Sequence, residues 1–396
     1  MRRRTAAVSA LLAAAALAPA AAPAVAATPA GPASAARGAD RGDLQRALDA
    51  VVAEGVPGAV AEVRDGRGVW RGSSGVADLA DGRKARPGDR FRAGSVTKSF
   101  VATVVLQLVA EGKVGLDDPI ERHLPGLVPG KDGAPVTVRQ LLNHTSGLPN
   151  YTDTWWDNGP GYLRTVQHGD YTPRGLVEEA LRRDTPDKPR PKPGTKWAYS
   201  NTNYVVLGML VEKITGRTLG QEIDRRIARP LHLTDTFVPT AAHLSGPHLN
   251  GYERLPGETA ATDFTDFTPT AFPGPGDLVS STADLNRFYR ALSGGKLLPQ
   301  RLWREMNTLH DTDRGAERKY GLGLESNSGY CPGEKPVWGH TGSVPGYNTF
   351  SFTTADGKRQ ITLALGMDLF KGDKADAAAL KVLSTALCTA PADGKQ

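Results

Sequence analysis

The sequence predicts an α+β protein in which one antiparallel sheet, flanked by helices, is built from both ends of the chain and an all-helical domain is inserted between them. Strand patterns lie at 58–72 and 337–368, near the two ends, and helix patterns occupy most of the chain between. Hydrophobic residues make up 39% of the 396 residues and charged residues 23%. That composition is typical of a globular protein and excludes a collagen-like, coiled-coil or wholly disordered chain.

The first strands are predicted as a hairpin. Residues 58–64 alternate small or apolar side chains with others, Asp65-Gly66-Arg67-Gly68 supplies a turn, and a return strand begins at Val69. Helical spacing of apolar residues over 43–53 predicts a helix before this hairpin.

The clearest helix is predicted over 95–111, where one wide apolar stripe ends at Gly112. Thr137 and Gln140 form a capping box that opens a short helix to Asn143. Further helices are predicted at 203–215 and 282–292, whereas 149–196, rich in Pro, Gly, Trp and charge, is predicted as loops that cover a cleft.

Strands are predicted again at 337–339, 348–354 and 360–368, followed by a closing helix over 374–387. The expected organisation is a sheet domain made of 41–94 plus 300–390 and a mainly helical domain made of 95–299, with the active site between them.

The N-terminus is typical of an export signal. Arg2-Arg3-Arg4 precedes an apolar stretch over 6–18 that is too short to span a bilayer, and Ala24-Val25-Ala26 fits a cleavage site. We therefore expect a signal peptide over 1–26, a flexible lead-in over 27–40, and a secreted monomer with no membrane anchor. The alternative is a buried Ala-rich helix.

Two cysteines, Cys331 and Cys388, would then lie in an oxidising compartment and permit one disulfide. The alternative is two unpaired buried thiols. They make a poor zinc site because no ligand cluster lies near them.

Charge and missing motifs exclude several function classes. The formal net charge is +6, but Lys and Arg are interleaved with acidic residues, which argues against a nucleic-acid partner. The sequence has no Gly-x-Ser-x-Gly elbow, His-Glu-x-x-His helix, Walker loop or dinucleotide fingerprint. We expect no metal and no cofactor.

Chemistry is suggested by Ser95-Val96-Thr97-Lys98 at the start of the long helix. Residues three apart share a helix face, so the Lys98 amine can reach the Ser95 hydroxyl. A serine needs a base to become a nucleophile, and a neutral lysine can serve. The alternative is a capping serine and a solvated lysine. A second copy of the pattern, Ser293 to Lys296, lies in a Gly-Gly turn and is attributed to chance.

Two further motifs strengthen this interpretation. In Tyr199-Ser200-Asn201, the two outer side chains point the same way if the segment is extended, so Tyr199 could face Ser95 and Asn201 a substrate. His340-Thr341-Gly342 opens the C-terminal strands, and Gly342 would let a substrate backbone approach closely. Singly, each motif also fits a purely structural role.

Together, in this order, the motifs resemble the serine penicillin-recognising hydrolases, and most closely the secreted D-alanyl-D-alanine carboxypeptidases of actinomycetes that are related to class C β-lactamases. The resemblance covers about residues 40–390. It is carried by segments 91–100, 137–148, 199–204, 320–323 and 339–343, which read FRAGSVTKSF, TVRQLLNHTSGL, YSNTNY, YGLG and GHTGS.

The resemblance implies a role for each matched residue. Ser95 would be the nucleophile, Lys98 its proton partner and Tyr199 a proton shuttle, with Lys98 and Tyr199 both open as the base. The backbone N–H groups of Ser95 and Ser343 would form an oxyanion hole. The implied substrate-binding residues are Asn201, His340, Thr341, Gly342, Ser343 and Trp156, with Trp155 beside the last.

The implied activity is that of a D-alanyl-D-alanine carboxypeptidase, which acts on peptidoglycan stem peptides and is acylated by β-lactams. Glu325 stands where a basic residue would help to bind the terminal carboxylate. The alternatives are therefore a class C-like β-lactamase or esterase on the same scaffold and, from another class, a non-catalytic protein that binds cell-wall peptides.

Overall fold

The computed structural model describes residues 39–153, 155, 161–255, 258, 260–368 and 374–388. The predicted signal peptide and Trp156 lie outside the described residues. All elements below belong to one compact unit, residues 36–396.

An eight-stranded antiparallel sheet has the order β2-β1-β12-β11-β10-β9-β8-β7. Its strands are β1 (Gly58–Asp65), β2 (Gly68–Gly75), β7 (His310–Asp311), β8 (Arg318–Tyr320), β9 (Glu325–Asn327), β10 (Val337–Val344), β11 (Tyr347–Thr354) and β12 (Gln360–Leu365). The two ends of the chain meet where β1 pairs with β12, in the register Ala59 to Leu365. The predicted fold class, a sheet built from both chain ends, is confirmed.

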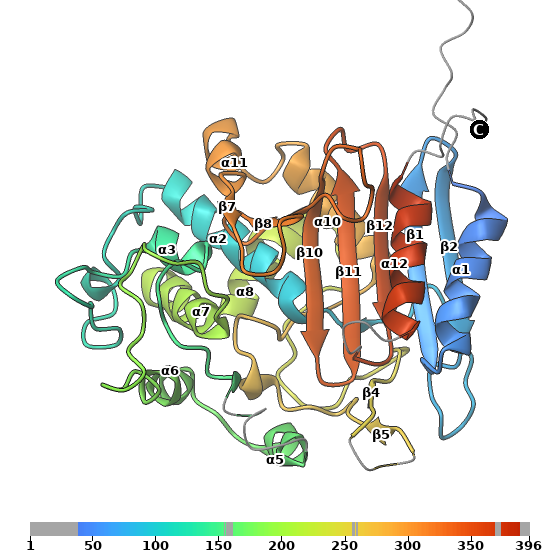
Figure 1. Ribbon diagram of the computed structural model, residues 1–396, viewed down its shortest axis with the longest axis horizontal. Helices are drawn as coiled ribbons and strands as arrows, with labels where there is room; N and C mark the ends of the chain where they lie inside the picture. Colours follow the sequence, from blue (N-terminus) through green and yellow to red (C-terminus); the bar gives the residue numbers. More distant parts are fainter. Residues whose placement is uncertain are drawn as a thin grey trace, which may run out of the picture. The chain divides into compact units, whose positions relative to one another are not determined.

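Helices α1 (Arg41–Ala53) and α12 (Lys374–Leu387) cover one face of this sheet and lie side by side (Figure 1). Their apolar faces, which include Leu48 and Leu383, share a core with the strands beneath. A Cys331–Cys388 disulfide, 2.12 Å between sulfurs, ties the end of α12 to the loop after β9, as predicted.

The opposite face of the sheet packs on the helical part of the chain. The helices there include α2 (Thr97–Ala110), α3 (Val138–Leu142), α5 (Tyr162–His168), α6 (Pro173–Leu181), α7 (Asn201–Thr215), α8 (Leu219–Ile223), α10 (Thr282–Ser293) and α11 (Gln300–Met306). Helix α2 is buried on nearly every side, and α10 packs on β1, β11 and β12. Phe100 of α2 stacks on Phe288 of α10. One hydrophobic core runs from the sheet through this whole part.

Two regions differ from the sequence expectation. Residues 149–196 contain α5 and α6, whose apolar faces are buried, so they are not only loops. Strands β7 to β9 are two or three residues long, too short for an alternating pattern to be visible in the sequence.

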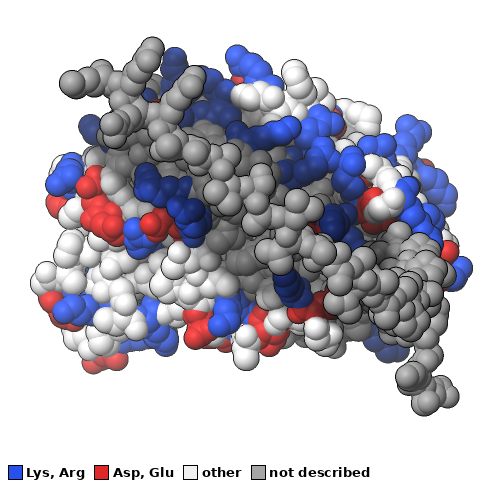
Figure 2. Space-filling view, turned by 90° about the horizontal axis from the view of Figure 1, so that it is seen from above, with Lys and Arg blue, Asp and Glu red and all other residues white. Residues whose placement is uncertain are grey.

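Two observations concern the surface and the membrane. Basic and acidic side chains lie next to one another on the face shown in Figure 2. Across the described residues, no helix combines the length and the apolar character needed to cross a bilayer.

Candidate active site

Ser95 lies in a short 3-10 turn, η1 (Gly94–Val96), that leads directly into α2. Gly94 adopts φ +55°, and a Cβ there would lie 2.8 Å from the Ser343 nitrogen. A Cβ on Gly342 would lie 2.1 Å from the Ala93 carbonyl oxygen. The two glycines therefore let strand β10 approach the turn that carries Ser95.

Lys98 is completely buried one helical turn after Ser95. Its Nζ lies 2.8 Å from Ser95 Oγ, 2.8 Å from Asn201 Oδ1 and 3.0 Å from the Pro275 carbonyl oxygen. Burial lowers the pKa of Lys98 well below its usual value, and the positive charge of Arg314 lowers it further. A neutral amine has two N–H donors for the two carbonyl oxygens and one lone pair for the Ser95 hydroxyl proton.

Tyr199 approaches Ser95 from the loop that precedes α7. Its hydroxyl donates to Ser95 Oγ over 2.9 Å, and burial raises its pKa, so at neutral pH it is a phenol. The Arg314 guanidinium lies 4.1 Å from the centre of the Tyr199 ring. Burial thus favours a neutral Lys98, which can accept a proton, and a protonated Tyr199, which can donate one.

Asn201 begins α7 and is oriented by two bonds. Its Oδ1 accepts from Lys98, and its Nδ2 donates to Thr152 Oγ1 over 3.2 Å. The amide N–H₂ thus faces the side of the cavity formed by the loop around Thr152, where a substrate carbonyl could accept from it.

The backbone of β10 supplies a second N–H group beside Ser95. Val344 and Tyr347 flank a two-residue turn, so they form a hydrogen-bonded pair and the next pair, Ser343 with Asn348, does not. The Ser343 N–H therefore points away from β11, toward the turn that carries Ser95. With the Ser95 N–H it can form the predicted oxyanion hole.

The hydroxyl protons of Thr341 and Ser343 are donated to carboxylates. Thr341 Oγ1 donates to Glu325 over 2.9 Å, and the Thr341 N–H donates to the same carboxylate over 3.2 Å. Ser343 Oγ donates to Asp368 over 2.7 Å. Both hydroxyls therefore present acceptor lone pairs to a substrate. Glu325 is buried against Thr341 and does not point into the cavity.

His340 does not line the cavity, although it was expected to bind substrate. It is fully buried, bonds to the Tyr320 hydroxyl over 2.9 Å, and burial lowers its pKa to about 4. Side chains alternate between the faces of a strand, so Thr341 and Ser343 face the cavity while His340 and Gly342 face inward. His340 is therefore neutral at physiological pH and supplies no positive charge to a substrate.

The catalytic cavity has a volume of about 270 Å³. Its walls include Ser95, Asn150, Thr152, Trp155, Leu163, Tyr199, Asn201, Phe272, Arg314, Thr341, Ser343 and Asp368. Trp155, which was expected beside the cleft, is 4% exposed and packs edge-on against Phe272. Among the described residues, no group of three or more His, Cys, Asp or Glu could hold a metal ion.

Two residues of the site had no role in the sequence interpretation. Arg314, on the loop before β8, lines the cavity and forms no ion pair with any described acidic residue. His144, in a left-handed conformation with φ 62°, packs its ring 4.3 Å from that of Tyr199. Its Nδ1 accepts from the Ser200 N–H over 3.2 Å, so it fixes the loop that aims Tyr199. The segment with His144 was part of the resemblance, whereas no sequence signal marked Arg314.

A family model described as Beta-lactamase matches residues 44–386. The chain belongs to the beta-lactamase family. Its resemblance to serine penicillin-recognising hydrolases is thereby confirmed, and the chain is a serine hydrolase.

Proteins similar to this chain carry names that describe different activities. A solved D-stereospecific amidohydrolase from a Streptomyces species is 39% identical, with a TM-score of 0.77 over 88% of this chain and 98% of the other. Esterase EstB of Burkholderia gladioli is 33% identical over 76% of this chain and 79% of its own length. A penicillin-binding protein of Bacillus subtilis (strain 168) is 27% identical over 77% of this chain, which spans only 66% of that protein.

Proposed function

We propose that this serine hydrolase cleaves amide bonds to the carbonyl of a D-amino acid residue through an acyl-enzyme on Ser95. The proposal rests mainly on the two groups that contact the Ser95 hydroxyl oxygen. Ser95 Oγ lies 2.8 Å from the buried amine of Lys98 and 2.9 Å from the phenol of Tyr199.

In acylation, Lys98 takes the Ser95 proton while Oγ attacks the substrate carbonyl carbon. The oxyanion that forms accepts hydrogen bonds from the N–H groups of Ser95 and Ser343. Tyr199 then donates its proton to the leaving nitrogen as the C–N bond breaks, which leaves Lys98 protonated and Tyr199 ionised. In deacylation, Tyr199 takes a proton from the water that attacks the ester carbonyl, and Lys98 returns its proton to Ser95 Oγ as the ester bond breaks.

The acyl side of the cavity fits an apolar side chain beside a polar backbone. Leu163, Trp155 and Phe272 supply an apolar wall, and the amides of Asn150 and Asn201 lie next to it. The D configuration is supported by the Streptomyces amidohydrolase, whose description names D-stereospecificity.

The leaving-group side fits an amide nitrogen better than a carboxylate. The hydroxyl groups of Thr341 and Ser343 use their protons in hydrogen bonds to Glu325 and Asp368, so toward the cavity they can only accept hydrogen bonds from N–H groups. A leaving amine offers such groups, whereas a carboxylate oxygen does not.

A second candidate is the D-alanyl-D-alanine carboxypeptidase activity, which the cation of Arg314 favours. Arg314 lines the cavity close to Tyr199 and could hold a terminal carboxylate in a charge-assisted hydrogen bond. β-Lactams and activated esters would acylate Ser95 in either case.

The test is hydrolysis of D-phenylalanine amide, L-phenylalanine amide and an N-acylated D-Ala-D-Ala peptide by the wild-type protein and Ser95→Ala. The proposal predicts that the D-amide is cleaved at least tenfold faster than its L enantiomer, and that Ser95→Ala cleaves neither. Cleavage of the D-Ala-D-Ala peptide alone would favour the second candidate, and equal rates on both enantiomers would overturn the stereochemical part.

We also propose that the protein is secreted. Support comes from the basic, apolar and small-residue order of residues 1–26 and from a disulfide, which persists in oxidising compartments. Mass spectrometry of culture supernatant should find a mature chain that begins after Ala26, and a full-length intracellular protein would contradict this.

A further inference from the structure

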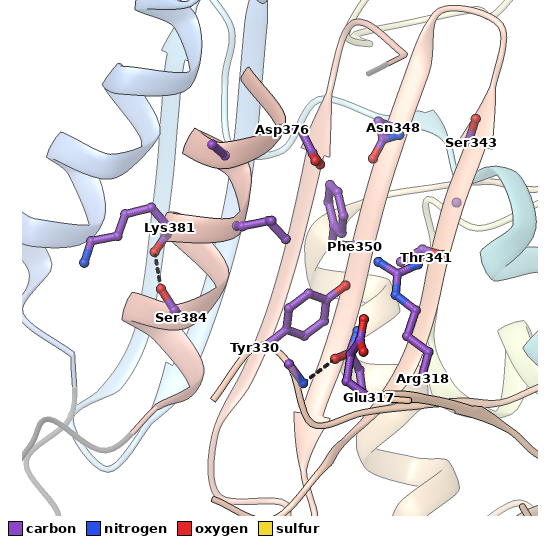
Figure 3. Close-up of a pocket in the computed structure, with 15 residues that line it drawn as sticks. Glu317, Arg318, Tyr330, Thr341, Ser343, Asn348, Phe350, Asp376, Lys381 and Ser384 are labelled. Atoms are coloured by element: carbon purple, nitrogen blue, oxygen red, sulfur yellow. Dashed lines mark hydrogen bonds between the residues drawn. The ribbon is translucent and has the colours of Figure 1, made fainter. Parts of the chain in front are cut away.

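A second hollow adjoins the catalytic cavity on the outer face of β10 and β11. It holds about 580 Å³, against 270 Å³ for the cavity itself. Strands β10 and β11 form its floor, residues 376–384 of α12 one wall and the segment 317–330 the other (Figure 3). We call it the β10–α12 groove.

The groove and the catalytic cavity meet at two residues. Thr341 and Ser343 line both spaces, and each presents an acceptor hydroxyl there. The catalytic cavity therefore adjoins the groove at these two residues of β10. A group that extends beyond the leaving nitrogen, bound at Thr341 and Ser343, would therefore enter the groove.

The lining of the groove fits a peptide. Phe350 supplies an apolar floor, Tyr330 lies in the wall formed by 317–330, and Leu380 of α12 is 36% exposed. Side chains of these types match an apolar residue. A leaving group as small as ammonia would use none of this surface.

The charged side chains of the groove favour an anion at the end of the groove that lies away from α12. Arg318 extends toward Thr341, whereas Lys381 points away from Phe350 (Figure 3). Arg318 forms no ion pair with a described carboxylate, while the next residue, Lys319, pairs with Asp311 over 2.9 Å. Glu317 and Asp376 also line the groove, so a second anion near either of them is disfavoured.

We infer that the β10–α12 groove binds the leaving half of the substrate, a peptide of at least two residues with a free carboxylate that Arg318 recognises. The inference rests on the proposed function, because it names the leaving group of the reaction at Ser95. The first residue of that peptide would pass Thr341 and Ser343, and its apolar side chain would contact Phe350 and Leu380.

The test keeps one D-aminoacyl group and varies what leaves: ammonia, a dipeptide with a free carboxylate, and the same dipeptide with a C-terminal amide. For the wild-type protein, kcat/KM for the free-carboxylate dipeptide should exceed that for its amidated form by tenfold or more, as a charge-assisted bond predicts. The kcat/KM for the free-carboxylate dipeptide should also exceed that for the substrate whose leaving group is ammonia. In Arg318→Met, the ratio of kcat/KM for the free-carboxylate dipeptide to kcat/KM for its amidated form should fall to near one.

Lys319→Met is the matched control, because it removes the same charge from the neighbouring position of β8, where the side chain pairs with Asp311. It should keep the wild-type preference. Equal rates on the two dipeptides in the wild-type protein, or a preference that survives Arg318→Met, would overturn the inference.

A second readout separates this inference from the proposed function. A p-nitrophenyl ester of the same D-aminoacyl group reports acylation of Ser95 with a leaving group that needs no peptide site. If the ester is hydrolysed and the free dipeptide competes with it in the wild-type protein but tenfold less in Arg318→Met, the groove is supported. Ester hydrolysis without such competition overturns the groove alone, whereas no acylation by any D-aminoacyl substrate overturns the proposed function.

Discussion

Replacing Tyr199 with Phe should separate substrates by the basicity of their leaving group. The phenol of Tyr199 donates to Ser95 Oγ over 2.9 Å and is the only group in the proposed mechanism that protonates the leaving nitrogen. The phenylalanine ring would keep the packing of tyrosine against His144 at 4.3 Å and under Arg314 at 4.1 Å. The fold and the position of Ser95 should therefore be preserved.

The size of the effect follows from the two roles of the phenol. Loss of the hydrogen bond alone costs about 1 kcal/mol, or roughly fivefold. Loss of a general acid costs about 10²- to 10⁴-fold, which corresponds to roughly 3 to 5 kcal/mol in the barrier. A D-amino acid amide should suffer the larger loss in kcat/KM, whereas a p-nitrophenyl ester, whose leaving phenolate needs no proton, should suffer only the smaller one.

Tyr289→Phe is the matched control, because Tyr289 also donates to a serine, Ser99, over 2.9 Å, but away from the cavity. It should change both rates by less than about threefold, since it removes an ordinary hydrogen bond. Circular dichroism and thermal unfolding of both variants report their folding. If Tyr199→Phe slows the ester as much as the amide, Tyr199 does not protonate the leaving group and the assignment is wrong.

Three further perturbations follow from the described contacts. Burial holds the pKa of Lys98 well below its usual value, and acylation needs the neutral amine, so the rate of ester acylation should rise with pH to a plateau below pH 10. In Lys98→Arg, this rate should fall at least a hundredfold and no longer rise with pH in the same range. Removing the Cys331–Cys388 disulfide, which closes a separation of 57 residues, should lower the free energy of unfolding in urea by up to about 4 kcal/mol, and no change would contradict its structural role. Burial and Asp368 raise the pKa of Glu253 to about 8, so its contribution to stability is present at acid pH and lost as pH rises through about 8. The free energy of unfolding of Glu253→Gln, relative to that of wild type, should therefore increase between about pH 5 and 8. A difference that stays constant with pH would refute this.

Local chemistry made part of the site predictable from the sequence. Ser95 and Lys98 are one helical turn apart, so their contact depends only on the helix that contains them. The disulfide followed from the number of cysteines and the expected compartment. The hairpin at 58–75 and the capping box at Thr137 are equally local features, and the structure contains both.

Strand parity explains the main error at the site. His340, Thr341, Gly342 and Ser343 were all assigned to substrate, yet consecutive residues of a strand cannot share a face. Once Thr341 and Ser343 face the cavity, His340 must be buried and Gly342 must contact the turn beneath it. The alternation of side chains along a strand would have shown that the His340 side chain cannot share a face with those of Thr341 and Ser343.

Long-range placement explains what the sequence could not supply. Glu325 reaches Thr341 only because β9 pairs with β10 in the register Glu325 to Gly339. Arg314 lies over Tyr199 because the loop between β7 and β8 turns back toward the cavity. Strands as short as β7 to β9 have no sequence pattern of their own, so neither their register nor the direction of their loop could be derived before the fold was known.

The central claim, that Ser95 is the nucleophile of an acyl-enzyme, is tested most directly by intact-mass spectrometry of the protein after brief exposure to benzylpenicillin, followed by peptide mapping. We predict one adduct of the mass of the intact β-lactam, located on Ser95 and absent from Ser95→Ala. An adduct that persists in Ser95→Ala or maps to another serine, such as Ser293 of the second Ser-x-x-Lys segment, would contradict the account.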